Sequence, residues 1–193
     1  EALSRIQITL ISGREPAQVV AFAAELGLTA PQVADNGAMI LDAITRSELR
    51  RISLGHDSSR QIIKRLSDYE MPFIATYPGG TTTDSAEVDN SRTIRISALN
   101  LDNIQADKLV SSFQYDHTMN VVKTALPYNS KWAVDFTSAG VNKATAVLWL
   151  SKAMKIDGSQ MIAVGDSYND LPMLQVAGLR IAMGDAPEEL KAI

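Results

Sequence analysis

The sequence contains no cysteine among its 193 residues. Disulfide bonds, thiolate metal sites and cysteine nucleophiles are therefore excluded together. With 46% hydrophobic residues, the chain can still bury one ordinary core, or a core together with a small inserted one. Its size and composition therefore allow an enzyme whose chemistry uses other side chains.

Long apolar runs and clusters of basic residues are also lacking. The longest apolar stretches, such as 160–165 and 19–24, are far shorter than the ~20 residues that cross a membrane. Charged residues make up 21% of the chain, the net charge is -4, and both signs are scattered. Because binding to nucleic acid needs a concentrated basic surface, neither nucleic acid nor a membrane is expected as a partner. The cytoplasm is the default expectation for localisation.

Strands and helices alternate in the predicted structure at both ends of the chain. Residues 6–11 form an apolar, β-branched run that predicts a buried parallel strand, and a helix with Pro16 in its first turn follows. Near the other end, residues 142–154 have helical spacing. The elements expected after them are a strand at 161–164, a helix at 171–177 and a strand at 179–183. This alternation predicts an α/β fold with a parallel sheet covered on both faces.

The middle of the chain has a different texture. It is rich in Ser, Thr, Asp and Asn around a strand-like run at 93–99 and two helical patterns at 58–69 and 104–113. Helices and strands mixed in this way predict a compact α+β insertion. We therefore expect two domains, a core formed by residues 1–43 and 132–193 and an inserted domain at 44–131.

The most specific stretch is Gly-Asp-Ser-Tyr-Asn-Asp, residues 165–170, between a predicted buried strand and a predicted helix. The carboxyl ends of strands are where open α/β sheets bind their ligands. Asp166 is a hard oxygen ligand suited to Mg²⁺, which takes one or two carboxylates and keeps several waters. Asn169 and Asp170 can cap the next helix and orient the waters of the metal. The alternative is an ordinary polar turn.

Ser12-Gly13-Arg14 also follows a predicted apolar strand. A hydroxyl group and the exposed N–H groups of a glycine turn form a phosphate cradle when a helix begins there. Taken alone, the pattern is as typical of a simple strand-to-helix turn.

Lys143 and Asn36 are two further candidates. Lys143 lies at the start of the predicted helix at 142–154, where a cation opposes the helix dipole and requires a compensating phosphate or carboxylate. Asn36 lies in an Asn-Gly turn between two extended pieces and can present its amide near the same sheet edge. The alternatives are a solvated surface lysine and a plain hairpin turn.

Along the chain these features follow one another in the order Ser12, Asn36, Lys143 and residues 166–170. In that order they resemble the haloacid dehalogenase (HAD) superfamily, specifically its members with a large type IIB cap. These include Cof-like sugar phosphatases and sucrose-phosphate and phosphoglycolate phosphatases. Four stretches are similar to family motifs: LISGR to the second motif, ADNGAMI to the NGA turn, GVNKATAVLWL to the third motif and VGDSYNDLPML to the fourth. The resemblance covers residues 1–41 and 134–193, whereas the middle matches only in position and size.

The resemblance implies a Rossmann-like core with a parallel sheet, an inserted smaller α+β cap domain and catalysis through an aspartyl-phosphate. Ser12 would hydrogen-bond the phosphoryl group, Lys143 would neutralise its charge, and Asp166 would bind Mg²⁺. Catalytic roles are implied for Ser12, Lys143 and Asp170, and metal-site roles for Asp166, Asn169 and Asp170. Substrate-binding roles are implied for Ser12, Gly13, Arg14, Asn36, Gly37, Lys143 and Asn169.

We therefore expect a Mg²⁺-dependent phosphatase, monomeric or homodimeric, that hydrolyses a small phosphorylated metabolite such as a sugar phosphate or phosphoglycolate. One alternative is a phosphomutase-type phosphotransferase of the same superfamily. The other is a non-catalytic phosphate-binding or interaction module.

In one respect the sequence departs from the family pattern. The first motif, DxDGT, supplies the nucleophile, and no two aspartates among these 193 residues are separated by one residue. In addition, residues 1–5 look like the end of a helix that runs directly into the strand at residue 6, and the chain ends within a predicted helix. We therefore expect the nucleophile strand upstream of residue 1.

Overall fold

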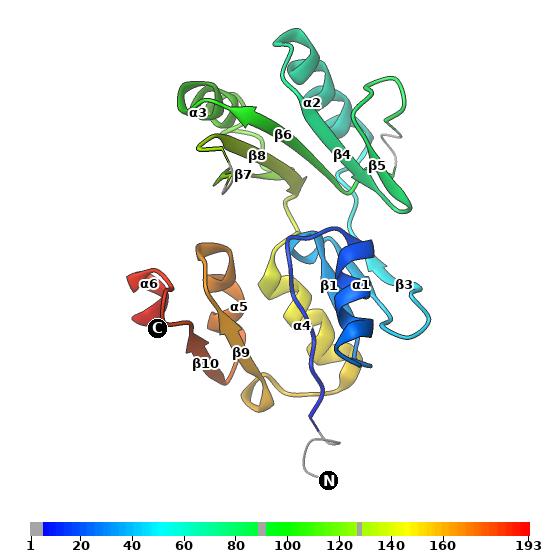
Figure 1. The fold of residues 1–193 in the computed structure, drawn as a ribbon, viewed down its shortest axis with the longest axis vertical. Coiled ribbons are helices and arrows are strands. Elements are labelled where there is room, and N and C mark those ends of the chain that lie inside the picture. The colour runs from blue at the N-terminus through cyan, green and yellow to red at the C-terminus, as the bar shows by residue number, and fades with distance from the viewer. Residues whose placement is uncertain (1–5, 89–91, 127–128) are drawn as a thin grey trace. The chain divides into compact units, whose positions relative to one another are not determined.

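The chain folds into two compact units (Figure 1). The structure is a computed structural model and describes residues 6–88, 92–126 and 129–193. Unit 1 comprises Glu1–Arg50 and Val141–Ile193, and unit 2 comprises Arg51–Gly140. Unit 2 is therefore inserted into the chain of unit 1.

The boundaries of the insertion differ from the expected 44–131. The largest difference concerns β8 (Trp132–Ser138), which was expected in the core domain but forms part of the sheet of unit 2. It lies between β6 (Arg95–Leu101) and β7 (Met119–Ala125) and pairs antiparallel with both along its length. The expectation for residues 132–140 was wrong because backbone pairing, which the local sequence does not reveal, assigns this strand.

The first half of unit 1 contains one long helix and three short strands. They are α1 (Pro16–Glu25), β1 (Gln32–Ala34), β2 (Met39–Leu41) and β3 (Glu48–Arg51), whose last residue falls in unit 2; the turn η2 (Asp35–Gly37) joins β1 and β2. The strands form a sheet in the order β1-β2-β3. Helix α1 agrees with its prediction, because proline occupies its first turn and the buried Val19, Val20 and Ala23 form one face.

The strand predicted at residues 6–11 is not formed as a strand. Only Ile11 makes a parallel bridge, to Val33, whose N–H and C=O bond the backbone of Leu10 and Ser12. The Leu10 N–H instead donates to the side-chain oxygen of Gln32 at 2.8 Å. A side chain therefore takes the place of the backbone acceptor, and the ladder stops there.

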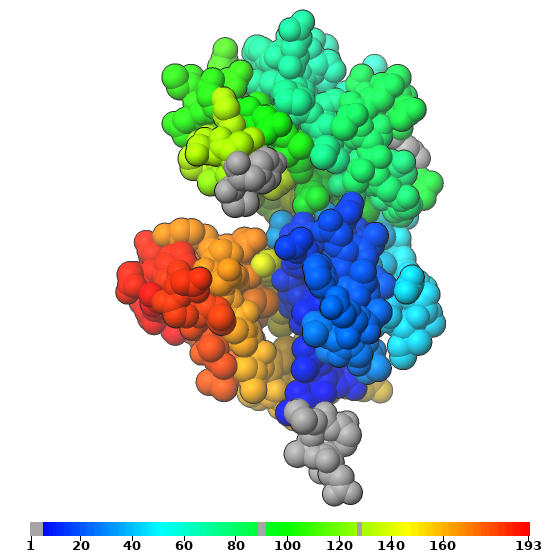
Figure 2. Space-filling view, viewed as in Figure 1, coloured from blue at the N-terminus to red at the C-terminus, as the bar shows by residue number. Residues whose placement is uncertain are grey.

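The second half of unit 1 packs on helix α4 (Lys143–Met154). It consists of η3 (Gly158–Gln160), β9 (Ile162–Gly165), η4 (Tyr168–Asp170), α5 (Leu171–Val176), β10 (Leu179–Ala182) and α6 (Glu188–Lys191). Strands β9 and β10 are parallel. Helix α4 joins two apolar clusters, because Val147 packs with the β9–α5 side while Ala146 and Leu150 pack with the β1–β2 side. Figure 2 shows these sides as a blue mass and an orange-to-red mass.

The strands of unit 1 leave large apolar side chains exposed. Ile162 and Val164 of β9 are 65% and 51% exposed, and Ile8 of the extended segment is 52% exposed. Strands of an α/β sheet are usually buried on both faces. The strand β9 and the extended segment before α1 therefore expose an unusual amount of apolar surface.

Unit 2 contains one continuous five-stranded sheet in the order β5-β4-β6-β8-β7, with every pair antiparallel. Its remaining elements are α2 (His56–Asp68), β4 (Phe73–Tyr77), β5 (Gly80–Thr82) and α3 (Asn103–Ser111). Residues of both helices, such as Ile62 and Leu109, join one apolar cluster with Ile96 and Phe136 of the sheet. Both helices therefore cover the same face.

The α/β fold class and the α+β character of the insertion are as expected. The helix expected at the end of the chain stops at Lys191 instead of continuing to Ile193. The expected helix end at residues 1–5 lies outside the described residues. Within the described part of the chain, no helix is long and apolar enough to cross a membrane.

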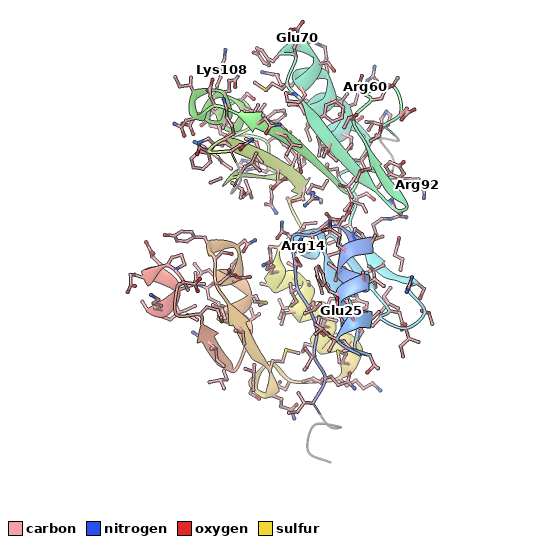
Figure 3. The ribbon with its side chains drawn as sticks, in the orientation of Figure 1. Arg14, Glu25, Arg60, Glu70, Arg92 and Lys108 are labelled. Carbon is pink, nitrogen blue, oxygen red and sulfur yellow. The ribbon has the colours of Figure 1, made fainter. Side chains whose placement is uncertain are left out.

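The side chains in Figure 3 place Arg14 just before α1 and Glu25 at its end.

Candidate active site

The start of α4 and the turn that follows β9 meet at a buried lysine. The loop at residues 12–14 is connected to them through Asn36. Lys143 lies in the first turn of α4, and its side chain is only 7% exposed. Asn142 precedes it and caps the helix with its side chain, which accepts a hydrogen bond from Thr145 N–H at 2.8 Å. This capping box fixes where the helix begins and thereby where Lys143 projects.

The ammonium group of Lys143 forms an ion pair with Asp170. Lys143 Nζ lies 2.5 Å from Asp170 Oδ1, and the Asp170 side chain is 5% exposed. A cation at a helix N-terminus requires an anion, and of the two expected anions, phosphate and carboxylate, the Asp170 carboxylate lies beside Lys143 in this structure. Removing either partner would leave a buried charge uncompensated.

Asp170 is also held by the backbone of its own turn. Its Oδ2 accepts hydrogen bonds from Asp166 N–H at 3.0 Å and from Ser167 N–H at 3.1 Å. Burial alone raises the pKa of the Asp170 carboxyl, but the hydrogen bond from Lys143 and those from the two N–H groups outweigh it and lower the pKa below its usual value. The carboxylate is therefore kept ionised beside the lysine.

Asp166 differs from Asp170 in its surroundings. It directly follows the last residue of β9 and is exposed, and no side chain among the described residues donates a hydrogen bond to its carboxylate. Those residues contain no group of three His, Cys, Asp or Glu side chains that could hold a metal. Mg²⁺ needs fewer protein ligands, because it takes one or two carboxylates with waters and phosphate oxygens. Asp166 fits such a site as a direct ligand better than Asp170, whose oxygens are already engaged.

Asn169 connects the loops. Its Oδ1 accepts hydrogen bonds from Lys143 Nζ at 3.3 Å and from Ser167 Oγ at 2.6 Å. Its Nδ2 donates to Oδ1 of Asn36 at 3.3 Å. The amide of Asn36 therefore lies at the same edge as Lys143 and the 166–170 turn, as the sequence suggested.

The loop at residues 12–14 reaches this group through Asn36. The Asn36 N–H donates to the carbonyl oxygen of Ser12 at 2.9 Å. A Cβ on Gly13 would stand 3.1 Å from the Asn36 amide, so glycine allows the close approach. The Ser12 hydroxyl accepts a hydrogen bond from Arg14 N–H at 3.1 Å. Ser12, Gly13 and Asn36 are thus contiguous.

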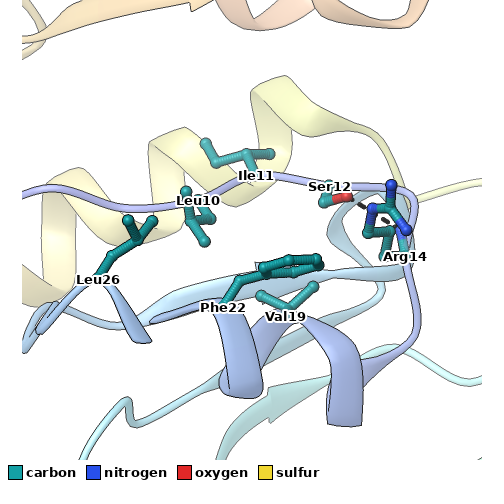
Figure 4. Close-up of a pocket in the computed structure, with 7 residues that line it drawn as sticks. All are labelled: Leu10, Ile11, Ser12, Arg14, Val19, Phe22 and Leu26. Atoms are coloured by element: carbon teal, nitrogen blue, oxygen red, sulfur yellow. Dashed lines mark hydrogen bonds between the residues drawn. The ribbon is translucent and has the colours of Figure 1, made fainter. Parts of the chain in front are cut away.

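Arg14 points elsewhere. Its guanidinium group lies 5.5 Å from the centre of the Phe22 ring on α1. Both residues line an apolar pocket of about 330 Å³ (Figure 4). The other lining residues are Leu10, Ile11, Ser12, Val19 and Leu26. This pocket shares Ser12 with the candidate site residues, but Lys143, Asn169 and Asp170 do not line it.

Sequence reasoning missed Ser167 and misjudged the helix cap. Asn169 and Asp170 were expected to cap α5, but Asp170, the residue before α5, makes no side-chain hydrogen bond to that helix. Ser167 and Asp170 instead form a capping box around the short turn η4. The signal was present as the spacing Ser-x-x-Asp at residues 167–170, which is typical of such a box.

Comparison with known proteins identifies the family. The model of the haloacid dehalogenase-like hydrolases matches residues 3–193. This chain belongs to the haloacid dehalogenase-like hydrolase family. It is 27% identical over 171 residues to phosphoglycolate phosphatase of Methanopyrus kandleri, an alignment that covers 87% of this chain and 65% of that protein. The chain therefore spans less than two thirds of that relative.

Solved structures of the family share the fold. A haloacid dehalogenase-like hydrolase from B. subtilis superposes with a TM-score of 0.82 at 18% identity, covering 100% of this chain and 82% of that one. A HAD subclass IIB sugar phosphatase gives a TM-score of 0.77 at 16% identity and covers 99% of this chain and 79% of that chain. The expected family and fold class are thereby confirmed.

Proposed function

We propose that this chain supplies the phosphate-binding and metal-binding part of a Mg²⁺-dependent phosphatase. The observation that carries the proposal is the buried Lys143, held by Asp170 and Asn169 beside the exposed Asp166. Lys143 is held by Asn169 and Asp170, which lie in the turn after the carboxyl end of β9. A buried ammonium group fixed in this way suits a dianionic phosphoryl group. Membership of a hydrolase family supports the same reaction class.

In the proposed reaction the residues of unit 1 position and stabilise the phosphoryl group. Ser12 donates its hydroxyl hydrogen to a phosphoryl oxygen. Lys143 balances the negative charge that shifts onto the oxygens as the ester bond breaks. Such positioning and charge stabilisation provide most of the catalysis in phosphoryl transfer.

Asp166 is the residue that we propose as a direct ligand of Mg²⁺. Its carboxylate is exposed and follows a β-strand, and the neighbouring Asn169 and Asp170 would orient the waters of the ion. When bound, Mg²⁺ supplies positive charge that neutralises the phosphoryl oxygens.

The nucleophile is proposed to be an aspartate outside these 193 residues. Its carboxylate oxygen forms a bond to phosphorus while the bond from phosphorus to the ester oxygen breaks, and the leaving alcohol takes a proton from an acid. Water then attacks the phosphorus of the aspartyl-phosphate, which releases inorganic phosphate, regenerates the carboxylate and gives up one proton. Unit 2 is proposed to be the cap domain of this enzyme.

The proposed substrate is a small phosphorylated metabolite, either a sugar phosphate or phosphoglycolate. The similarity to the Methanopyrus kandleri protein supports phosphoglycolate, and the fold shared with a sugar phosphatase supports a sugar phosphate. A panel of these phosphate esters, assayed at equal concentration with the full-length protein, distinguishes the two by their kcat/KM values.

The test of the metal site is hydrolysis of p-nitrophenyl phosphate by the full-length protein with and without Mg²⁺. Wild type is expected to require the metal, and Asp166→Ala is expected to lose the Mg²⁺-dependent rate. Asp157→Ala is the matched control, because Asp157 is an exposed turn aspartate of unit 1 whose side chain caps η3. It should keep wild-type metal dependence. Full Mg²⁺-dependent activity in Asp166→Ala would remove that residue from the site.

A further inference from the structure

The turn η2 touches each of the loops that carry candidate site residues. Asn36 has φ 57° and ψ 23°, a left-handed conformation that asparagine tolerates better than most residues. Its N–H holds the carbonyl of Ser12, and its side chain accepts from Asn169. Gly37 has φ 107°, and a Cβ there would stand 2.5 Å from the carbonyl oxygen of Asn142, the residue before Lys143. The turn therefore contacts all three loops within one short segment.

The side chain of Asn169 is fixed from both ends. Its oxygen accepts from Lys143 and Ser167, and its nitrogen donates to Asn36. Rotation of the amide about its last bond would exchange nitrogen and oxygen and place a donor against the lysine ammonium. The hydrogen bond to Asn36 selects the orientation in which the oxygen faces Lys143.

The conformation of the turn does not by itself require a side chain at position 36. Glycine occupies a left-handed conformation at least as readily as asparagine and is the usual residue there. Asparagine adds an amide that reaches residues 133 positions away in the sequence. Its particular contribution is therefore the contact with Asn169.

We propose that Asn36 is a positioning residue, whose amide orients Asn169 and through it the ammonium group of Lys143, while its backbone holds Ser12. Asn36 thus fixes the spacing between the 12–14 loop and the 166–170 turn. It does so without touching the phosphoryl group, in contrast to the substrate-binding role that the family resemblance implied. The inference rests on the proposed phosphatase function for its kinetic consequences only.

The kinetic test is a double-mutant cycle in the full-length protein, with Asn36→Gly, Asn169→Ala and the double variant. Asn36→Gly keeps the backbone conformation and removes the amide. It is expected to lower kcat for p-nitrophenyl phosphate about tenfold, as loss of an orienting partner does, with KM changed less than about twofold. Because Asn36 acts through Asn169, the double variant should be no slower than Asn169→Ala alone. Additive losses, or a loss confined to KM, would overturn the proposal.

Asn100→Gly provides a closely matched control. Asn100 of unit 2 also has φ 57°, and its Oδ1 accepts a hydrogen bond from the side-chain amide of Asn129 at 2.7 Å. The control therefore makes the same chemical change at a residue with the same φ, in the unit that does not carry the candidate site. It should leave kcat unchanged.

A readout without catalysis separates failure of this inference from failure of the proposed function. In ¹⁵N–¹H spectra, the side-chain amide signals of Asn169 are expected to shift in Asn36→Gly and to stay in place in Asn100→Gly. Unchanged Asn169 signals would contradict the positioning role, whether or not the wild-type protein hydrolyses phosphate esters. Absence of hydrolysis in wild type together with shifted signals would reject the phosphatase and retain the positioning role.

Discussion

Unit 1 and unit 2 build their sheets differently. In unit 2 five antiparallel strands form one continuous sheet, and two helices cover one face with a single apolar cluster. In unit 1 the strands form two separate groups, both packed on α4, with Ile162 and Val164 exposed. Unit 2 thus derives its stability mainly from apolar packing, whereas unit 1 also depends on a buried polar network around Lys143. The polar network lies where the candidate chemistry does.

The sequence provides a convenient way to follow the two units separately. It contains two tryptophans, Trp132 in unit 2 and Trp149 in unit 1. Fluorescence of a Trp149→Phe variant therefore reports unfolding of unit 2, and that of Trp132→Phe reports unfolding of unit 1. Urea denaturation in these two backgrounds therefore measures the stability of each unit separately.

The largest effect is expected from Phe136→Ala in unit 2. Phe136 is fully buried, and its ring lies 5.0 Å from that of Phe113 in an edge-to-face arrangement. Removing the ring leaves a cavity and should lower the free energy of unfolding of unit 2 by about 4 kcal/mol. The unfolding transition of unit 2 that Trp132 reports (the Trp132 transition) should move to lower urea. The unfolding transition of unit 1 that Trp149 reports (the Trp149 transition) should stay in place. Equal movement of both would show that the cores are not separate.

Lys143→Met is expected to have the next largest effect, confined to unit 1. The change leaves the buried carboxylate of Asp170 without its cation and should cost about 3 kcal/mol in the Trp149 transition. Lys123→Met of unit 2 is the control, because Lys123 pairs with Asp107 at 2.6 Å but the Asp107 side chain is 60% exposed. That variant should cost less than about 1 kcal/mol in the Trp132 transition. Similar losses for the two pairs would contradict the distinction between buried and exposed ion pairs.

Helix caps allow a smaller, closely matched comparison. Asp102 begins α3 in unit 2 and Asn142 begins α4 in unit 1, and each forms a capping box. Asp102→Ala and Asn142→Ala should each cost about 1 kcal/mol in their own unit. Only Asn142→Ala should also lower the hydrolysis rate, because that cap fixes the start of the helix that carries Lys143. An equal effect of both variants on the rate would contradict the role of the Asn142 cap in placing Lys143.

The smallest effect concerns acid and unit 2. The hydrogen bonds that Asp116 accepts from the side chain and then the backbone N–H of Thr118 lower the pKa of its carboxyl below the usual 3.8. Since the pKa in the folded protein lies below that of the unfolded chain, this contribution is present above about pH 4 and is lost as the pH falls through the folded value. Asp116→Asn should therefore make the Trp132 transition slightly less dependent on pH below 4. An unchanged pH dependence would contradict the prediction.

Local patterns predicted the helices of the core well. Pro16 and the apolar face of α1, and the capping residue and spacing of α4, are signals contained within one segment. Pairing between strands is not local, and this explains the two errors of assignment. Residues 6–11 have the composition of a strand, but Gln32 supplies the acceptor that a ladder would need, and β8 is assigned by its neighbours β6 and β7.

The candidate site was predicted in its parts and not in its connections. Ser12 could be recognised because it follows an apolar run, Lys143 because it begins a helix and Asp166 because it follows a strand. The contact between Asn36 and Asn169 joins residues 133 positions apart, and no local pattern encodes it. That an aspartate outside these 193 residues supplies the nucleophile stays a prediction.

The most direct test of the central claim is the kcat/KM of the full-length protein for p-nitrophenyl phosphate in the presence of Mg²⁺. Lys143→Met is compared with Lys152→Met, which changes an exposed lysine in the last turn of the same helix. Wild type and Lys152→Met are expected to show Mg²⁺-dependent hydrolysis, and Lys143→Met is expected to lose at least about 100-fold in kcat/KM. Hydrolysis by Lys143→Met at the wild-type rate, under conditions where it remains folded, would show that Lys143 does not stabilise the phosphoryl group.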